Sequence, residues 1–282
     1  MNSVASDFNY IACFLTFACP YDCWFCINRE SRLEPRKMLA AEKWIAFINS
    51  LETDVPITLQ GGEPTMHPGF YDIVNRTSQP IDLLTNLSFD ADTFIANVSP
   101  KRFYRHAPFA PIRVSFYDHR VDFSEFVAKC RRLIDAGFDL FVYSLDFPDS
   151  PPERAANLKR RFAEYGIEHR MKPFLGTYNG KLHPPDGYLF AEGVSRKAAK
   201  RCQCRTTEIL VAPDGSMFRC HADLYENVGA VAHSDDPAEA LQCKYRPCDR
   251  FGQCNPCDLK VKNNRQEQFG HCAVSIKDIE HR

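Results

Sequence analysis

The sequence has 282 residues, of which 44% are hydrophobic and 25% are charged, and its formal net charge is −1. These values allow one large α/β domain, or one domain with a small appendix, and they argue against a disordered chain. No long basic run is present, so the electrostatic footprint of a nucleic-acid-binding protein is missing. No stretch of about 18 apolar residues is available to span a bilayer. We therefore expect neither nucleic acid nor membrane as a partner.

Apolar runs and helical stripes alternate along the first two thirds of the chain. The predicted strands are 10–17, 57–59, 81–85, 112–116, 140–145 and 167–172. The predicted helices are 39–51, 69–76, 89–96, 122–136 and 151–165, with Ser88 expected to cap the third of them. Such β-α repeats predict an α/β fold with a parallel sheet and right-handed crossovers. The repeats are too few for a closed eight-stranded barrel, so we expect a partial (β/α)6 barrel with its ligands at the carboxyl ends of the strands.

The pattern changes after residue 172. Residues 173–187 are rich in Pro and Gly and are expected to form a loop. Segments 208–211 and 217–219 flank Pro213-Asp214-Gly215, which predicts a hairpin. We expect a core domain over 1–195 and a small cysteine-rich β-hairpin and loop extension over 196–282. The extension has few apolar runs, so a metal cluster would have to stabilise it.

The sequence contains 13 cysteines, an unusual number for a chain of this kind. Disulfide frameworks are typical of short secreted proteins, and this chain is neither short nor equipped with a charged signal-peptide n-region. A reducing cytoplasm is the expected location, where clustered cysteines indicate metal binding or catalysis. Cys13 and Cys130 fall on apolar faces and are interpreted as core residues.

Three cysteines directly follow the first predicted strand. Cys19, Cys23 and Cys26 are spaced as C-x3-C-x2-C, and thiolates are the usual ligands of iron–sulfur clusters. Three thiolates leave one of four irons without a protein ligand, where another molecule can bind. The alternative is a zinc site or a redox pair, but a structural zinc site needs four ligands and no fourth lies nearby.

The triad and a second motif together resemble the radical S-adenosylmethionine (SAM) superfamily. Phe25 precedes the last cysteine, and Gly61-Gly62-Glu63-Pro64 follows the second strand. The resemblance extends over residues 8–175. It implies a [4Fe–4S] cluster on the triad with SAM at the open iron. It also implies that the reduced cluster cleaves SAM to a 5′-deoxyadenosyl radical, which abstracts hydrogen from a substrate.

The same resemblance implies which residues contact SAM. The backbone of the second motif would bind the SAM amino group, and residues after the third and fourth strands often touch SAM in similar enzymes. The residues concerned are Gly61, Gly62, Glu63, Pro64, Thr85, Asn86 and Ser115. Ser115 is equally well interpreted as an ordinary strand residue. Arg170 and Lys172 would either reach the SAM carboxylate or remain solvated.

Cysteines in the extension resemble the SPASM and twitch domains of some radical SAM enzymes, which carry auxiliary [4Fe–4S] clusters. Cys204 is followed by ten residues, Gly215, four residues and Cys220. The favoured ligand set for at least one auxiliary cluster is Cys204, Cys220, Cys254 and Cys257, with Cys202 and Cys248 as substitutes. Two clusters or a structural zinc site are the alternatives. The spacing over 243–257 is C-x4-C-x5-C-x2-C, which departs from the SPASM pattern C-x2-C-x5-C-x3-C.

Two classes of function follow from these expectations. The first is a radical SAM enzyme whose auxiliary cluster assists the oxidation or rearrangement of a small molecule, or alternatively a maturase that modifies a peptide or protein. Flavodoxin or ferredoxin would serve as reductant. Little sequence precedes the first strand, which favours a substrate that needs no separate leader-binding domain. The second class is a non-catalytic iron–sulfur electron-transfer protein, although pure electron transfer needs no open iron.

Overall fold

The computed structural model describes residues 2–26, 28, 38–105, 109–174, 176–179, 181–183, 200–251 and 274–279. The predicted ligands Cys254 and Cys257 lie outside the described residues. So does Cys272, which the two-cluster alternative would use.

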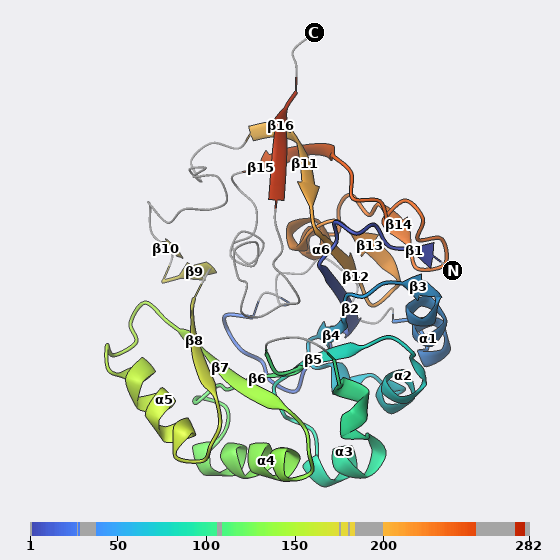
Figure 1. Cartoon of the computed structure of the whole chain (residues 1–282). Helices are drawn as coiled ribbons and strands as arrows, with labels where there is room; N and C mark the ends of the chain where they lie inside the picture. Colours follow the sequence, from blue (N-terminus) through green and yellow to red (C-terminus); the bar gives the residue numbers. More distant parts are fainter. Residues whose placement is uncertain are drawn as a thin grey trace.

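One nine-stranded sheet forms the body of the protein (Figure 1). Its strands are β2 (Tyr10–Thr16), β4 (Ile57–Gly61), β5 (Ile81–Thr85), β6 (Ile112–Ser115), β7 (Leu140–Asp146), β8 (His169–Pro173), β12 (Glu208–Val211), β13 (Ser216–Phe218) and β14 (Ala232–His233). They are arranged in the order β14-β13-β12-β2-β4-β5-β6-β7-β8. The strands from β12 to β8 are parallel to their neighbours, so the six predicted strands form one parallel array. The predicted partial barrel is confirmed.

Five helices connect these strands and lie on the outer side of the curved sheet (Figure 1). They are α1 (Ala41–Ser50), α2 (Phe70–Arg76), α3 (Ala91–Asn97), α4 (Phe123–Asp135) and α5 (Arg154–Ala163), with short 3₁₀ turns η2 (Pro64–Met66) and η3 (Pro100–Phe103) between them. The predicted cap of α3 was wrong. Asp90, not Ser88, accepts the Thr93 N–H at 2.8 Å, while the Ser88 N–H donates to the Asn86 side chain.

The chain forms further short elements that the sequence pattern did not predict. They are β1 (Asn2–Ser3) paired with β3 (Leu51–Glu52), β9 (Gly176–Tyr178) paired with β10 (Lys181–His183), the three-stranded sheet of β11 (Lys200–Thr206), β15 (Arg246–Phe251) and β16 (Val274–Asp278), and α6 (His221–Glu226). The prediction of a plain loop over 173–187 was therefore wrong for 176–178 and 181–183, while 175, 180 and 184–187 lie outside the described residues. A hairpin forms there because the turn between β9 and β10 places Asn179 in the left-handed region, with a φ of 49°.

The hairpin predicted around Pro213-Asp214-Gly215 is confirmed as β12 and β13. Its first strand lies parallel to β2, with Glu208 opposite Tyr10 and Val211 opposite Cys13. The large sheet therefore continues into the part of the chain after residue 195. The division of the chain at residue 195 stays a prediction.

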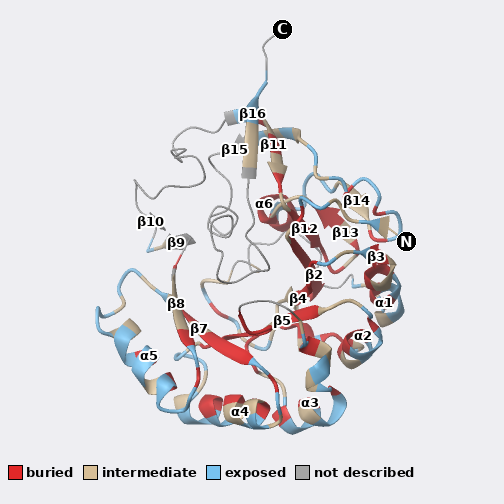
Figure 2. Cartoon of the chain, viewed as in Figure 1, coloured by how far each residue is buried: buried red, intermediate tan, exposed pale blue. Residues whose placement is uncertain are grey.

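Buried side chains gather on the sheet and on the helix faces that pack against it (Figure 2). Cys13 and Cys130 are both 0% exposed within this core, as predicted. Burial raises the pKa of the Cys130 thiol to about 12. Both side chains are neutral, apolar packing groups at neutral pH.

His169 makes the stability of the core dependent on pH. Its ring stacks on Phe162, its Nε2 lies 3.0 Å from the Ser144 hydroxyl, and the residue is 6% exposed. Burial, followed by the charge of Arg154, lowers the pKa of His169 to about 4 from 6.5. The unfolded chain takes up this proton first as the pH falls. The free energy of unfolding is therefore highest, as far as His169 is concerned, above pH 6.5. It falls by up to about 3 kcal/mol as the pH falls toward 4.

Urea unfolding of the His169→Asn variant at pH 7 and pH 5 tests this expectation. The wild type should lose more unfolding free energy between the two pH values than the variant does. The control is His233→Asn, because the His233 side chain is 43% exposed. Equal pH dependence in the wild type and in His169→Asn would contradict the assignment to His169.

Candidate active site

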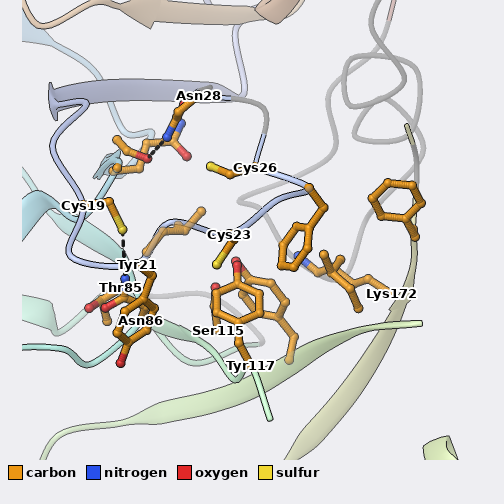
Figure 3. Close-up of a pocket in the computed structure, with 18 of the residues that line it drawn as sticks. Cys19, Tyr21, Cys23, Cys26, Asn28, Thr85, Asn86, Ser115, Tyr117 and Lys172 are labelled. Atoms are coloured by element: carbon orange, nitrogen blue, oxygen red, sulfur yellow. Dashed lines mark hydrogen bonds between the residues drawn. The ribbon is translucent and has the colours of Figure 1, made fainter. Parts of the chain in front are cut away.

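A cavity of about 280 Å³ opens at the carboxyl ends of the parallel strands (Figure 3). Its wall includes all three triad cysteines and residues from β4, β5, β6, β7, β8 and α6. Of the predicted site residues, the cavity brings together Cys19, Cys23, Cys26, Gly61, Gly62, Thr85, Asn86 and Ser115. The parallel topology explains this convergence, because the carboxyl ends of neighbouring strands meet at one edge.

The three thiols stand on the loop that follows β2. Cys23 is 4% exposed, whereas Cys19 and Cys26 are half-buried. Burial raises the pKa of both Cys19 and Cys23, while a hydrogen bond from Arg120 acts in the opposite direction on Cys23. The Arg120 guanidinium also donates to the carbonyl of Asp22 in the same loop. The loop therefore presents the three sulfurs to one cavity and has a cation beside one of them.

Gly61 and Gly62 pack directly against the strand and loop that lead to the triad. The Gly62 N–H donates to the Thr16 carbonyl at 2.8 Å, and the Glu63 N–H donates to the Ala18 carbonyl at 2.8 Å. A Cβ at Gly61 would lie 2.1 Å from the Thr16 oxygen, and one at Gly62 would lie 2.3 Å from the Ala18 oxygen. These backbone contacts leave no room for a side chain. The two motifs are thus one packed unit.

Glu63 is 0% exposed and its carboxylate is engaged inside the protein, not in the cavity wall. It accepts hydrogen bonds from the Thr85 hydroxyl at 2.9 Å, the Asn86 N–H at 2.8 Å and the Thr65 hydroxyl at 2.7 Å. Burial raises the pKa of Glu63, and these hydrogen bonds partly offset that effect. Glu63 therefore ties the end of β4 to the end of β5. Pro64 follows it as the first residue of η2 and is also buried.

Asn86 links the end of β5 to the triad. Its side-chain amide donates to the Cys19 sulfur at 3.4 Å (Figure 3). Hydrogen bonds to ligand sulfurs are among the features that tune iron–sulfur sites. Asn86 therefore contacts Cys19, a candidate ligand of the cluster, whether or not it also contacts SAM. Ser115 ends β6 on the cavity side and interacts with Tyr117.

Several cavity residues were missing from the sequence prediction. They are Tyr21, Asn28, Gln60, Leu84, Tyr117, Tyr143, Leu145, Phe174 and Tyr225. Alternation along β7 is the signal for two of them, since Tyr143 and Leu145 lie on the same face of the strand. Tyr225 comes from α6 and carried no such signal. Of the two cations considered at the sixth predicted strand, Lys172 lines the cavity, 3.8 Å from the centre of the Tyr143 ring. Arg170 instead lies over Phe141 and pairs with Glu168.

The donor groups fit a [4Fe–4S] cluster with SAM. Three thiols face one cavity, and a side-chain amide already donates to one of the sulfurs. No three His, Cys, Asp or Glu side chains among the residues described in the structure converge closely enough to hold a single metal ion. Each thiolate of a cubane binds a different iron, so its ligands need not converge on one point. The backbone of Gly61 and Gly62, which carry no side chains, also borders the cavity.

A second group of cysteines lies at the three-stranded sheet. Cys202 and Cys204 are 0% and 6% exposed on β11, and Cys202 is paired with Cys248 on β15. A hydrogen bond with Cys248, followed by burial and the charge of Cys220, raises the pKa of Cys204. The structure thus gathers four of the six predicted auxiliary ligands, while Cys254 and Cys257 lie outside the described residues.

His221 follows Cys220 as the first residue of α6 and is 7% exposed, so it is a buried residue. Its ring contacts Phe14 and Tyr225, with centroids 6.1 Å away in both cases. Cys220 is the N-cap of α6, and Tyr225 on the same helix lines the cavity. One short helix therefore joins the second cysteine group to the candidate active site.

Comparisons with known proteins agree with this geometry. A family model described as the radical SAM superfamily matches residues 14–172. No curated protein is similar enough in sequence to match the chain. The fold resembles Streptococcus suis SuiB with a TM-score of 0.59 at 11% identity, covering 84% of this chain and 66% of SuiB. The chain thus spans about two thirds of the length of SuiB.

Two further solved structures share the fold. SuiB bound to precursor peptide SuiA matches with a TM-score of 0.52 at 12% identity, covering 84% of this chain and 64% of that one. Native anSMEcpe with bound AdoMet and Cp18Cys peptide matches with a TM-score of 0.55 at 13% identity, covering 82% and 79%. Within the described part of the chain, no helix combines the length and apolarity needed to cross a membrane.

Proposed function

The chain belongs to the radical SAM superfamily, and on that premise we propose that it is an enzyme that cleaves SAM reductively and abstracts hydrogen from a substrate. The observation that carries the proposal is the convergence of Cys19, Cys23 and Cys26 with Gly61 and Gly62 on one cavity. An electron-transfer protein has no need for such a cavity beside three ligands. The proposed cofactors at this site are a [4Fe–4S] cluster and SAM.

When bound, the reduced cluster and SAM supply the electron transfer that yields methionine and a 5′-deoxyadenosyl radical. The protein holds the cofactor and the substrate in position and shields the reaction from water. Cys19, Cys23 and Cys26 would hold the cluster and leave one of its irons available to SAM. Gly61 and Gly62 allow a ligand to approach the backbone at the end of β4. In our proposal Thr85, Asn86 and Ser115 complete the SAM side of the cavity.

Other residues of the cavity wall are suited to a substrate with both apolar and polar groups. Tyr117, Tyr143 and Tyr225 supply ring faces and hydroxyls, and Lys172 supplies a cation. Burial and the neighbouring Tyr143 raise the pKa of Tyr117 well above its usual value, so it is a neutral hydrogen-bond donor. Aromatic side chains that exclude water protect a reactive radical from side reactions.

We favour a peptide as the substrate class over the small molecule that the sequence favoured. Two proteins that share the fold are described with peptides, SuiB with SuiA and anSMEcpe with Cp18Cys. An auxiliary [4Fe–4S] cluster in the region 196–282, a flavodoxin or ferredoxin as reductant and a cytoplasmic location complete the proposal. The reaction would be either an oxidation or a rearrangement of the peptide.

SAM cleavage tests the proposal directly. Anaerobically reconstituted protein reduced with dithionite should form 5′-deoxyadenosine and methionine in equal amounts, as measured by liquid chromatography with mass detection. A cluster-loaded protein that forms no 5′-deoxyadenosine with any reductant would contradict the enzyme assignment. Deuterium transfer from a deuterated peptide digest into 5′-deoxyadenosine, but not from a deuterated peptide-free metabolite fraction, would support the peptide over the small molecule.

A further inference from the structure

The cavity wall at the ends of β7 and β8 places a cation beside apolar side chains. Lys172 on β8 is half-buried, and its Nζ lies 3.8 Å from the centre of the Tyr143 ring on β7. Leu145 is paired with Lys172 in the register of the two strands, and both line the cavity. An ammonium group on the face of an aromatic ring is attracted to the ring and can still donate hydrogen bonds to an anion. This part of the wall can therefore hold an anionic group next to an apolar one.

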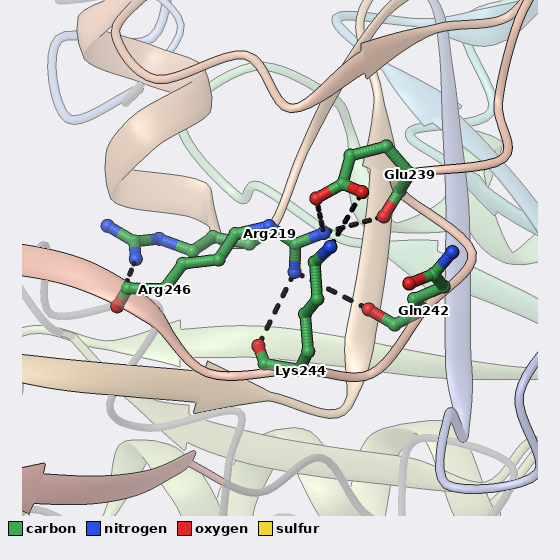
Figure 4. A network of polar contacts seen from close by, with 5 residues as sticks. All are labelled: Arg219, Glu239, Gln242, Lys244 and Arg246. Atoms are coloured by element: carbon green, nitrogen blue, oxygen red, sulfur yellow. Dashed lines mark hydrogen bonds and ion pairs between the residues drawn. The ribbon is translucent and has the colours of Figure 1, made fainter.

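The residues that line the cavity include a cation but no acidic side chain. Within the described part of the chain, Lys172 is the only Lys or Arg in the wall, and neither Asp nor Glu contributes to it. Elsewhere the chain supplies its own carboxylates to its cations. Arg246 donates to the Glu239 carboxylate at 3.1 Å (Figure 4), and Arg219 is bonded to Asp223 at 2.6 Å. A cavity with this lining favours a ligand that brings a carboxylate of its own.

Lys172 lies apart from the residues proposed to contact SAM. Those residues end or follow β4, β5 and β6, whereas Lys172 belongs to β8, the last strand of the parallel array. Neighbouring strands lie about 4.8 Å apart, so the ends of β5 and β8 are roughly 14 Å apart along the sheet. In the view of Figure 3, Lys172 lies on the far side of Cys23 from Asn86. This separation favours the substrate over SAM as the ligand of Lys172.

An aromatic cluster extends from this end of the cavity to the protein surface. Phe25 and Phe174 line the cavity, and Trp24 packs against both, with ring centres 5.3 and 6.1 Å away. Trp24 also contacts Phe147 and Tyr178, at 5.5 and 5.3 Å. Despite these contacts Trp24 is 50% exposed. An exposed aromatic ring at the rim of a ligand cavity is suited to cover an apolar side chain of the ligand.

We propose that Lys172 and Trp24 define a substrate-recognition site for a peptide carboxylate that adjoins an aromatic or large apolar side chain. Lys172 binds the carboxylate inside the cavity, and Trp24 covers the neighbouring apolar side chain at the rim. An acidic side chain and a C-terminal carboxylate share this chemistry. The inference rests on the proposed function for the choice of a peptide, and it concerns substrate binding and not SAM cleavage.

Calorimetry of the cluster-loaded protein with saturating SAM measures the affinity for synthetic peptides. The probes are amidated hexapeptides with Phe-Glu, Phe-Gln or Ala-Glu between paired glycines, and Gly-Gly-Phe with a free or an amidated C-terminus. We expect the carboxylate peptide of a matched pair to bind about 10-fold more tightly than its amide, and the pair that shows this preference identifies the source of the carboxylate. The Phe-Glu peptide should also bind about 10-fold more tightly than the Ala-Glu peptide.

Variants of Lys172 separate the substrate from SAM. Lys172→Gln should abolish the preference for the carboxylate, whereas Lys172→Arg should keep it. The matched control is Lys159→Gln, a change at an exposed lysine of α5 outside the cavity wall, and it should keep the preference too. If Lys172 held the SAM carboxylate instead, Lys172→Gln would weaken both peptides of a pair alike and leave their ratio unchanged. That result would overturn the proposal.

Tryptophan emission tests the part assigned to Trp24. The chain has 2 tryptophans, and Trp44 is 0% exposed in the core, so an emission change on peptide binding reports on Trp24. The Phe-Glu peptide should shift the emission to shorter wavelength, and Trp24→Ala should lose the preference for Phe over Ala. Unchanged emission, or equal binding of all peptides by the wild type, would overturn the proposal even if the protein cleaves SAM. Selective binding without SAM cleavage would contradict the proposed function and support this site.

Discussion

Replacing Cys23 with alanine is expected to abolish 5′-deoxyadenosine formation and to remove the cluster at the triad. Cys23 is the most buried of the three cysteines, at 4% exposure, and its sulfur faces the cavity. Its loss leaves two of four irons without a protein thiolate, so the cluster is no longer held by a complete triad. Product formation by chromatography and iron content per chain measure the two effects.

The matched control for this change is Cys130→Ala. Cys130 is 0% exposed on α4 and is absent from the cavity wall. We expect it to lose about 1 kcal/mol of unfolding free energy through the missing sulfur, with SAM cleavage unchanged. If Cys23→Ala formed product at the wild-type rate, the triad would not be the site of SAM cleavage.

Replacing Gly62 with alanine is expected to lower SAM cleavage about 100-fold while the protein remains folded. The added Cβ would lie 2.3 Å from the Ala18 oxygen and 2.5 Å from the Phe17 oxygen. Both atoms are backbone, so the loop that leads to Cys19 must move away from β4. A displacement of about 1 Å at a catalytic site can cost about 100-fold in rate. Rates at saturating SAM and circular dichroism separate misplacement from unfolding.

Gly166→Ala serves as the control for this second change. Gly166 has a φ of +68°, so alanine is strained there, but a Cβ would meet nothing nearer than Arg131 at 3.8 Å. It should lose stability without losing activity. Equal activity in Gly62→Ala and the wild type would show that the contact between the two motifs is not required for catalysis.

The parallel sheet was predictable from sequence because strands such as β2 and β7 are compact apolar runs that alternate with helical stripes. Predicted strand 81–85 coincides with β5, and the other five predicted core strands shift by at most a few residues. The residue that caps the N-terminus of α3 was not predictable from the order of residues alone. Ser88 and Asp90 are both good capping residues, and the choice depends on Asn86, whose side chain accepts the Ser88 N–H.

The candidate site was predictable at positions where the backbone geometry permits only certain residue types, because such positions appear in the sequence as short motifs. Gly61 and Gly62 have no room for a Cβ, and that constraint is visible in the sequence as paired glycines. Tyr225 was not predictable, because it reaches the cavity from a short helix far beyond the triad in the sequence. The pairing of Cys202 with Cys248 depends on the register of β11 against β15, which no local pattern in either strand specifies.

Electron paramagnetic resonance of the reduced protein, before and after addition of SAM, tests the central claim most directly. The claim is that Cys19, Cys23 and Cys26 leave one iron open for SAM. We expect SAM to change the spectrum of one cluster in the wild type and to change nothing in the Cys23→Ala variant. A reduced cluster in the wild type whose spectrum is the same with and without saturating SAM would contradict the account.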